Sequence, residues 1–305
     1  MSLTSTKNKT IVVVVGPTAV GKTAMAIELA KKFSTEILSA DSRQFYREMS
    51  IGTAKPSLEE LAQAKHHFID SHSITEPYSA GDFERDALVL LSNLFLTKDV
   101  AIVVGGSGLF IRALCEGLDS LPNVSEEIRS RLNLKAEQEG IASFQELLKT
   151  IDPAFYESQS IHNTQRVIRA MEIYEATGNP ISYYQQKNTD KRPFNIITIG
   201  LNTDRQLLYD RINKRVDGMM ANGLLEEVKG LENYKSYPAL QTVGYAELFD
   251  YLDTKISLLE ATDKIKQNSR KYAKRQITWF KKYGETEWFE PNDTEGILDY
   301  IDQKL

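Results

Sequence analysis

Gly16-Pro17-Thr18-Ala19-Val20-Gly21-Lys22-Thr23 follows an unbroken β-branched run, Ile11–Val15, and precedes an amphipathic stretch, Ala24–Lys32. This is the G-x-x-x-x-G-K-[ST] phosphate loop in its strand–loop–helix context. Glycine lets the backbone curl so that successive N–H groups surround anionic oxygens, and the following helix adds the positive end of its dipole. Lys22 supplies a mobile positive charge, and the Thr23 hydroxyl is placed to ligate Mg²⁺. The segment therefore predicts a binding site for a di- or triphosphate.

The apolar runs around this loop predict the fold class. Three near-continuously apolar segments, Ile11–Val15, Glu36–Ala40 and Val100–Val104, are typical of parallel strands buried on both faces. Helical patterns separate them, and a fourth such strand, Asn195–Leu201, follows much later. This order predicts an α/β fold with a P-loop NTPase-like open parallel sheet flanked by helices.

A change of pattern in the middle of the chain predicts an insertion. Between Leu121-Pro122 and Arg192-Pro193 the β-branched runs disappear, and apolar residues recur at helical spacing. We expect an all-helical insertion at residues 123–193. It would separate the first part of the core, 1–122, from the completion of the core and the C-terminal helices at 194–305.

Composition limits the possible classes of function. The chain has 305 residues, a net charge of −5 and one cysteine. These values exclude a globally basic nucleic-acid binder, an internal disulfide and a zinc site with several cysteines. We find no apolar run long enough to span a membrane and no signal-peptide pattern, and therefore expect a cytoplasmic protein, most simply a monomer.

Polar side chains follow two of the predicted strands. Asp41 comes directly after the second strand, and Gly105-Gly106-Ser107-Gly108 follows the third. Ligands of open α/β sheets bind at the carboxyl ends of the strands, so we expect both segments beside the phosphate loop. Asp41 could contact a magnesium-bound water, act as a general base or cap the next helix, and Ser107 could orient a ligand or belong to a simple turn.

Two arginines of the expected insertion could contact phosphates. Arg166 and Arg169 are three residues apart and therefore share one face of a helix. Two guanidinium groups on one face suit phosphate binding. The same face could instead pair with Glu172 and Glu175, and the spacing alone favours this second interpretation.

A basic segment near the C-terminus is a further candidate. Between Lys264 and Lys282 there are eight Lys or Arg and no acid, with aromatic residues interleaved. The segment could bind a nucleic-acid backbone or a diphosphate, or it could be an amphipathic helix with solvated lysines. We expect a mixture of the two, with Arg270 and Arg275 as the functional members.

Three histidines, His66, His67 and His72, lie close together in the sequence. No carboxylate stands at the spacing of a zinc site. We expect a loop with partly packed imidazole rings.

Taken together, these motifs resemble those of the bacterial tRNA dimethylallyltransferases, the isopentenyl-tRNA transferase family, over nearly the whole chain. The phosphate loop is similar to that family's Gly-Pro-Thr-x-x-Gly-Lys-Thr. Ile51–Pro56 is especially specific, because nothing in phosphate binding demands it. Ser107 stands where the family usually has Thr, so a hydroxyl is kept. The other matching segments are Asp41–Tyr46, His66–Asp70, Tyr78–Ala80, Gly105–Leu109, Gln165–Ala170, Gln241–Tyr245 and Lys274–Phe280.

The resemblance implies transfer of a dimethylallyl group from dimethylallyl diphosphate to N6 of the adenosine beside the anticodon, position 37, in tRNAs that read codons starting with U. The phosphate loop with Lys22, Arg275 and a Thr23-bound Mg²⁺ would hold the diphosphate. Asp41 would accept the N6 proton, and Ser107 would orient an adenosine flipped out of its stack. The residues implied to contact the anticodon stem-loop of tRNA are Asp41, Ser42, Arg43, Gln44, Ser107, Arg129, Gln165, Arg166, Val167, Ile168 and Arg169.

Other functions remain possible at this point. A small-molecule kinase would share the phosphate loop and the parallel sheet, although such kinases are usually shorter. A prenyltransferase acting on free adenylates would share the chemistry. A non-catalytic RNA-binding protein with a relic loop is disfavoured by the presence of Lys22, Thr23, Asp41 and Ser107.

Overall fold

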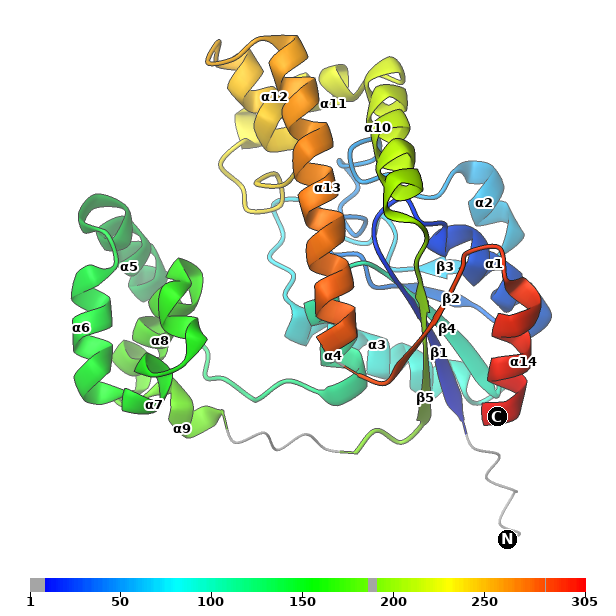
Figure 1. The fold of residues 1–305 in the computed structure, drawn as a ribbon. Helices are drawn as coiled ribbons and strands as arrows, with labels where there is room; N and C mark the ends of the chain where they lie inside the picture. Colours follow the sequence, from blue (N-terminus) through cyan, green and yellow to red (C-terminus); the bar gives the residue numbers. More distant parts are fainter. Residues whose placement is uncertain (1–8, 186–190, 283) are drawn as a thin grey trace, which may run out of the picture. The chain divides into compact units, whose positions relative to one another are not determined.

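The structure, a computed structural model, describes residues 9–185, 191–282 and 284–305. The described chain folds around a six-stranded parallel sheet in the order β3-β2-β4-β1-β5-β6 (Figure 1). β1 pairs with β4 on one side and with β5 on the other, so that Val12 lies opposite Ile102 and Ile197. The predicted α/β fold with an open parallel sheet is confirmed. The strands are β1 Thr10–Val15, β2 Ile37–Ser39, β3 His66–His67, β4 Val100–Val104, β5 Asn195–Leu201 and β6 Thr286–Phe289.

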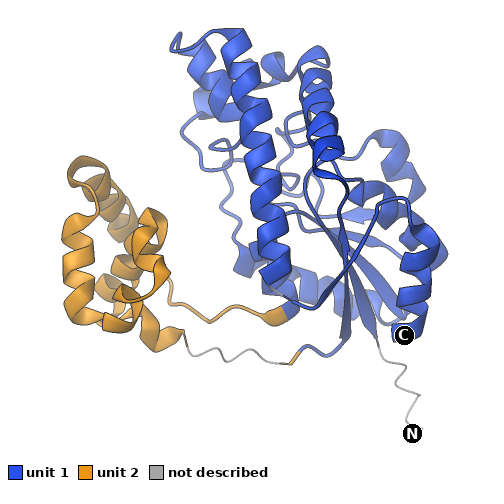
Figure 2. Ribbon diagram, in the orientation of Figure 1, with its two compact units in different colours: residues 1–115, 192–305 blue, residues 116–191 orange. Residues whose placement is uncertain are grey.

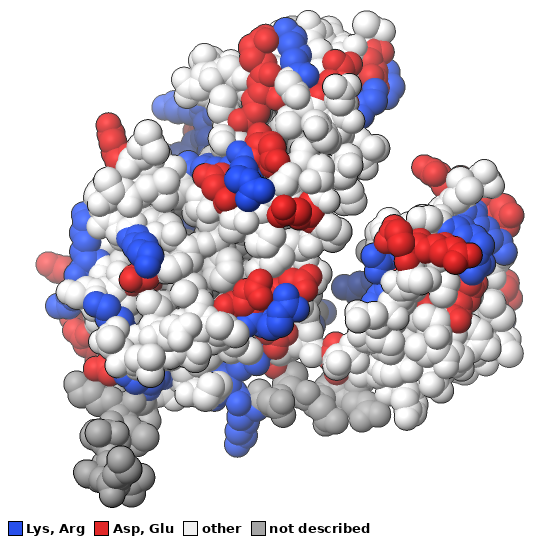
Figure 3. All heavy atoms as spheres, turned by 180° about the vertical axis from the view of Figure 1, so that it is seen from behind, with Lys and Arg blue, Asp and Glu red and all other residues white. Residues whose placement is uncertain are grey.

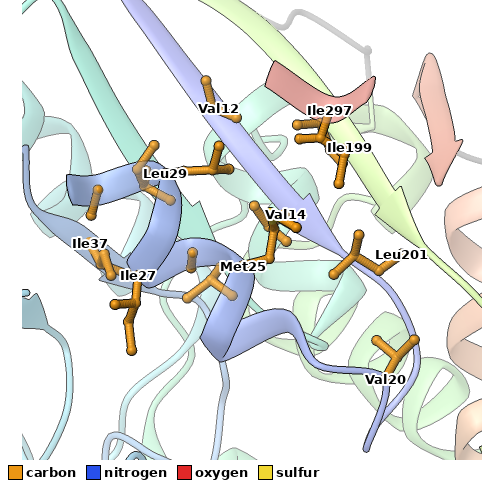
Figure 4. Close-up of a cluster of buried hydrophobic side chains, with 14 of the residues drawn as sticks. Val12, Val14, Val20, Met25, Ile27, Leu29, Ile37, Ile199, Leu201 and Ile297 are labelled. Carbon is orange, nitrogen blue, oxygen red and sulfur yellow. The ribbon is translucent and has the colours of Figure 1, made fainter. Parts of the chain in front are cut away.

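Helices cover both faces of this sheet, so that every residue of β1 is buried. Successive side chains of a strand point to opposite faces. Val12 and Val14 belong to the buried cluster on one face, where they pack with residues of α1 and α14 (Figure 4). Ile11 and Val13 belong to the cluster on the other face, with residues of α3 and α4. These helices are α1 Lys22–Lys32, α3 Ala80–Leu94, α4 Gly108–Glu116 and α14 Thr294–Lys304.

The carboxyl ends of three neighbouring strands place the expected site. β1, β2 and β4 are adjacent and parallel. The phosphate loop follows β1, Asp41 follows β2, and Gly105–Gly108 follows β4. All three segments therefore leave the sheet at the same edge.

A group of helices from residues 205–282 forms a further layer with its own buried core. Its core contains Val216, Leu224, Tyr245 and Ile265, each at most 3% exposed. Its longest member, α13, has 25 residues. In the part of the chain that the structure describes, no helix is both long and apolar enough to cross a membrane. The helices are α10 Arg205–Ala221, α11 Leu224–Gly230, α12 Tyr245–Leu252 and α13 Leu258–Lys282, with a 3₁₀ turn at Glu232–Tyr234 after α11. The short helix α2, Leu58–Gln63, contacts α1 instead.

The chain divides into two compact units, residues 1–115 with 192–305 and residues 116–191 (Figure 2). The second unit is helical and has its own core, which includes Leu132, Val167 and Met171. The insertion expected from the sequence spanned residues 123–193, of which 186–190 lie outside the described residues. Its helices are α5 Glu126–Glu139, α6 Ala142–Ile151, α7 Pro153–Tyr156, α8 Thr164–Thr177 and α9 Ile181–Tyr184, with a 3₁₀ turn at Gln159–His162.

Two strands were not predicted. His66–His67, expected in a loop, forms β3 at one edge of the sheet, and Thr286–Phe289 forms β6 at the other. Both are short, and no residue of either is fully buried, so neither shows the continuous apolar run of a central strand. The His67 Nε2 atom lies against the Glu36 carboxylate, and no cluster of three metal-ligating side chains occurs in the described residues.

Candidate functional site

The phosphate loop curls because three of its residues adopt positive φ angles. These are Gly16 at 146°, Ala19 at 64° and Gly21 at 111°. A Cβ atom at Gly16 would lie 2.4 Å from the carbonyl oxygen of Leu201, so only glycine fits there. α1 begins directly after Gly21, so the free N–H groups of its first turn add to the loop.

Some residues of the phosphate loop line a cavity, and the others are buried in the protein. Thr18, Ala19, Gly21, Lys22 and Thr23 line a cavity of about 900 Å³. The other three expected members do not line it: Gly16 and Pro17 are buried beneath the loop, and Val20 packs in the core (Figure 4). Val20 and its buried neighbours therefore hold the shape of the loop.

Lys22 stands in an unusual electrostatic setting. Its Nζ donates to the carbonyl oxygen of Pro17 at 2.7 Å, which keeps the side chain folded over the loop. Burial lowers the pKa of Lys22 to about 8; the Asp41 carboxylate opposes this shift, and the Arg215 guanidinium adds to it. An anion bound in the loop would favour the charged form of Lys22.

The cavity concentrates positive charge. Its lining contains three acids, Asp41, Glu60 and Glu247. The cationic lining residues outnumber them, and in a protein of net charge −5 this local excess favours an anionic ligand. The cationic residues are Lys22, Arg43, Lys55, Arg211, Arg215 and Arg275.

Asp41 lies in the cavity wall at the end of β2, as the sequence predicted. Its Oδ1 accepts the N–H of Arg43 at 3.0 Å. This contact fixes the carboxylate within a turn, and because the next helix begins only at Leu58, with Ser57 as its N-cap, the helix-capping role considered from the sequence is not present. The same carboxylate acts electrostatically on Lys22 and Arg215, and its position in the cavity remains compatible with a general base.

Ser107 lies just behind the cavity wall, at 9% exposure. Its Oγ accepts the N–H of Ser42 at 2.9 Å and lies 3.0 Å from the Ser42 hydroxyl. Ser107 is also hydrogen-bonded to the hydroxyl of Tyr272, which lines the cavity. Burial and the nearby Asp41 carboxylate raise the pKa of Tyr272 to about 12, so this hydroxyl stays protonated.

Ser42 and Gln44 belong to the same turn. Gln44 lines the cavity, and both ends of its side-chain amide are engaged. Its Nε2 donates to the carbonyl oxygens of Thr53 at 3.2 Å and Ala54 at 3.1 Å, and its Oε1 lies 3.2 Å from the Ser39 hydroxyl. Gln44 thus ties the end of β2 to the following loop.

The two arginines that the sequence singled out, Arg270 and Arg275, both lie on the basic helix α13 but have different surroundings. Arg275 lines the cavity, and its guanidinium lies 5.8 Å from the centre of the Tyr272 ring. Arg270 is not among the residues lining this cavity and donates instead to Asn213 Oδ1 at 2.6 Å. The site therefore contains Arg275 but not Arg270.

Gln276 and Arg215 belong to the site and were not assigned a role from the sequence. Gln276 accepts the N–H of Thr18 at 2.8 Å and donates to the Gly106 carbonyl at 3.0 Å, so it bridges two loops of the site. The sequence feature that could have pointed to Gln276 is its place between Ala273 and Phe280, as a polar residue on the buried face of an amphipathic helix. Arg215 on α10 lines the cavity, where burial lowers its pKa and Asp41 opposes the shift; no local motif marks it.

In the second unit, Arg129 and Arg169, which the resemblance assigns to tRNA binding, both contact Glu172. Arg169 donates to Glu172 Oε2 at 2.8 Å and to the Pro122 carbonyl at 3.3 Å. The Nε of Arg129, from α5, lies 3.8 Å from Glu172 Oε1. The Glu172 side chain is 6% exposed, whereas the two arginine side chains remain 31% and 44% exposed. Of the pairing considered from the sequence, the contact between Arg169 and Glu172 is present, whereas Glu175 pairs with Arg131. The guanidinium groups of Arg129 and Arg169 still reach solvent.

The other expected tRNA contacts of this unit differ in exposure. Gln165 and Arg166 are exposed in the first turn of α8, and Arg166 donates to the Ser160 hydroxyl at 3.1 Å. Val167 and Ile168 have their side chains in the core of the unit, because the helical period turns them inward. These two side chains therefore support the helix that carries Arg166 and Arg169 and do not reach its exposed surface. Figure 3 shows acidic and basic side chains interspersed on the visible face of the protein.

Comparison with known proteins shows which family this chain is similar to in sequence and in fold. Residues 44–283 match the family model described as IPP transferase. The chain is 50% identical to the tRNA dimethylallyltransferase of Christiangramia forsetii over 96% of this chain and 97% of that one. Its identity to the enzyme of the same name from Cytophaga hutchinsonii is 48%, over 98% of both chains. The fold is similar to the full-length tRNA isopentenylpyrophosphate transferase from Bacillus halodurans, with a TM-score of 0.73, 37% identity and coverage of 98% and 97%. A eukaryotic dimethylallyltransferase acting on tRNA has a TM-score of 0.77 at 26% identity, over 97% of this chain and 77% of its own.

Proposed function

The chain belongs to the IPP transferase family and transfers a dimethylallyl group to tRNA; we propose that the donor is dimethylallyl diphosphate and the acceptor is N6 of adenosine 37, in tRNAs that read codons starting with U. One observation carries this proposal. A phosphate loop and several arginines share a single cavity with a carboxylate, Asp41. Such a cavity can hold a diphosphate and accept a proton from a second substrate in the same space.

The diphosphate would bind at the phosphate loop. Lys22, Arg215 and Arg275 line the cavity together with the loop, where they would neutralise the charge that builds on the leaving group. The cavity also has apolar lining, which suits the dimethylallyl chain. These apolar residues are Ile212, Val216, Met219, Val243 and Ile265.

The reaction would be a substitution at C1 of the donor. The lone pair of adenine N6 forms the new C–N bond while the C–O bond to diphosphate breaks, and the diphosphate leaves with that electron pair. The N6 proton passes to the Asp41 carboxylate, which the N–H of Arg43 holds in place. An exocyclic adenine amine is a weak nucleophile, so a positioned base would contribute about 10²–10⁴-fold. Ser107 would orient the adenine through the hydroxyl network that it forms with Ser42 and Tyr272.

Magnesium fits this site as a partner of the diphosphate. In the described residues no three His, Cys, Asp or Glu side chains lie where they could together hold a metal ion. The Thr23 hydroxyl lines the cavity beside Lys22, and a hard cation with oxygen ligands suits a hydroxyl and diphosphate oxygens. Thr23 would hold Mg²⁺ there, and the ion would supply positive charge to the leaving group.

The tRNA would contact both units. Asp41–Gln44 would meet the target nucleotide, which must leave its stack to reach the cavity. Arg129, Arg166 and Arg169 would contact phosphates of the anticodon stem-loop. We further propose that the enzyme acts as a monomer in the cytoplasm.

A transfer assay tests the proposed function. Purified protein, Mg²⁺, radiolabelled dimethylallyl diphosphate and unmodified tRNA with adenosine at position 37 are mixed, and the label in the RNA is counted. Transfer to this tRNA, but neither to free AMP nor to a tRNA with guanosine at position 37, is the expected result. Label in AMP would indicate an adenylate prenyltransferase, and a phosphorylated small acceptor in a parallel assay with ATP would indicate a kinase.

A further inference from the structure

Glu227 on α11 accepts hydrogen bonds from two segments of the larger unit that are far apart in sequence. Its carboxylate accepts the backbone N–H groups of Ser50 at 3.0 Å, Ile51 at 2.7 Å and Gly52 at 3.0 Å. It also accepts the hydroxyl of Tyr245 at 2.6 Å. A carboxylate that takes three consecutive backbone N–H groups fixes the conformation of that backbone, because bonds to a charged acceptor are stronger than neutral ones.

Tyr245 closes the same arrangement from the other side. Its side chain is fully buried, and burial together with the Glu227 carboxylate raises its pKa, so the hydroxyl remains a donor. Gly52 packs against the Tyr245 ring so closely that a Cβ atom would lie 2.5 Å from it. Glu227, Tyr245 and residues 50–52 therefore form one packed and hydrogen-bonded unit, which we term the Glu227 clamp.

The Glu227 clamp holds two walls of the cavity. Gly52, the last clamped residue, lines the cavity together with Thr53–Lys55, and Gln241–Gly244 line it directly before Tyr245. Glu227 itself does not line the cavity. The segments that it joins are the two family-like motifs, Ile51–Pro56 and Gln241–Tyr245, for which phosphate binding gives no reason.

We propose that Glu227 is a positioning residue for the prenyl donor. By fixing both walls before the donor binds, it shapes the part of the cavity that these two segments line, where the dimethylallyl chain would pack. This role rests on the proposed function. The turn that carries Asp41 touches the clamped loop through the Gln44 side chain, but its backbone is closed by its own hydrogen bonds, from Gln44 N–H to the Asp41 carbonyl at 3.2 Å and from Asp70 N–H to the Gln44 carbonyl at 3.2 Å. We therefore expect loosening of the clamp to affect the donor more than the tRNA contacts at this turn.

The test compares Glu227→Gln with Glu226→Gln. Glu226 is the adjacent residue, is exposed and pairs with Lys229 at 2.7 Å, so it controls for the loss of one charge on α11. We expect Glu227→Gln to raise the Kd for dimethylallyl diphosphate, measured by calorimetry without tRNA, about tenfold, and to change the Kd for tRNA less than about twofold. Amide hydrogen exchange should accelerate at residues 50–52 in this variant and not in Glu226→Gln.

Tyr245→Phe provides a second variant if Glu227→Gln does not fold. It removes the hydroxyl and leaves the carboxylate with its three N–H partners, and it should weaken donor binding in the same direction by a smaller factor. Circular dichroism melting establishes that each variant is folded. A folded Glu227→Gln enzyme with wild-type donor affinity would overturn the positioning role. If Glu227→Gln does not fold, wild-type donor affinity of a folded Tyr245→Phe enzyme would overturn it instead. A wild-type protein that neither binds the donor nor modifies tRNA would instead overturn the proposed function, and this role with it.

Discussion

The side chain of Gln276 accepts the backbone N–H of Thr18 at 2.8 Å and so ties helix α13 to the phosphate loop. Its other end donates to the Gly106 carbonyl at 3.0 Å, and the residue is 5% exposed. Gln276→Ala would leave the part-buried Thr18 N–H and the buried Gly106 carbonyl without this partner. We expect the free energy of unfolding to fall by about 1–3 kcal/mol and diphosphate to bind more weakly. Urea denaturation and calorimetry with diphosphate measure the two effects.

Gln267→Ala is the matched control, because Gln267 is exposed on the same helix. It should change neither stability nor diphosphate affinity. Equal behaviour of the two alanine variants would show that the bridge between the loops has no role in either property.

Asp41→Asn tests the general base. Asparagine retains an oxygen that can accept the N–H of Arg43, so the turn should persist, but the amide cannot take up the N6 proton. We expect the turnover rate at saturating substrates to fall about 10²–10⁴-fold, with little change in tRNA affinity. Single-turnover kinetics and filter binding give the two values.

Glu60→Gln is the control for Asp41→Asn, since Glu60 is another carboxylate of the cavity lining. It should retain turnover within about fivefold. Near-normal turnover of Asp41→Asn would remove Asp41 as the base, and an equal loss in both variants would point to the overall charge of the cavity instead.

The pH dependence of donor capture should reflect Lys22. Burial lowers the pKa of Lys22 to about 8, so the ammonium form is present below this pH and is lost above it. Because the diphosphate is attracted to the charged form, kcat/KM for dimethylallyl diphosphate should be level below about pH 8 and fall up to about tenfold per pH unit above it. Lys22→Arg, which stays charged, should lack this decline. A wild-type profile that is flat well above pH 8 would contradict the assignment.

The sequence predicts the central strands and not the edges for a physical reason. β1, β4 and β5 have helices on both faces and therefore carry long apolar runs that can be read locally. β3 and β6 are edge strands of two and four residues whose pairing depends on the neighbouring strand and not on their own pattern. Their existence could not be read from a short window of sequence.

The candidate site shows the same division. The phosphate loop, Asp41 and Ser107 follow strands and could be predicted from local order. Gln276 and Glu227 act on residues 258 and 175–177 positions away in the chain, so their roles appear only after folding. Arg270 and Arg275 could have been separated in advance, because five residues correspond to about 140° around a helix.

Arg169→Ala tests the second unit as a tRNA-binding element. Arg169 is held by Glu172 and by the Pro122 carbonyl and is 31% exposed, so its guanidinium is ordered and can still reach a phosphate. We expect its loss to weaken tRNA binding about tenfold and to reduce the slope of log K against log salt by about 1, with donor affinity unchanged. Arg131→Ala is the control. Arg131 lies on α5, pairs with Glu175 on α8 and was not assigned to tRNA. If both variants weaken binding equally, the effect is general electrostatic attraction; if Arg169→Ala binds tRNA normally, the arginine serves only to neutralise the buried Glu172 carboxylate.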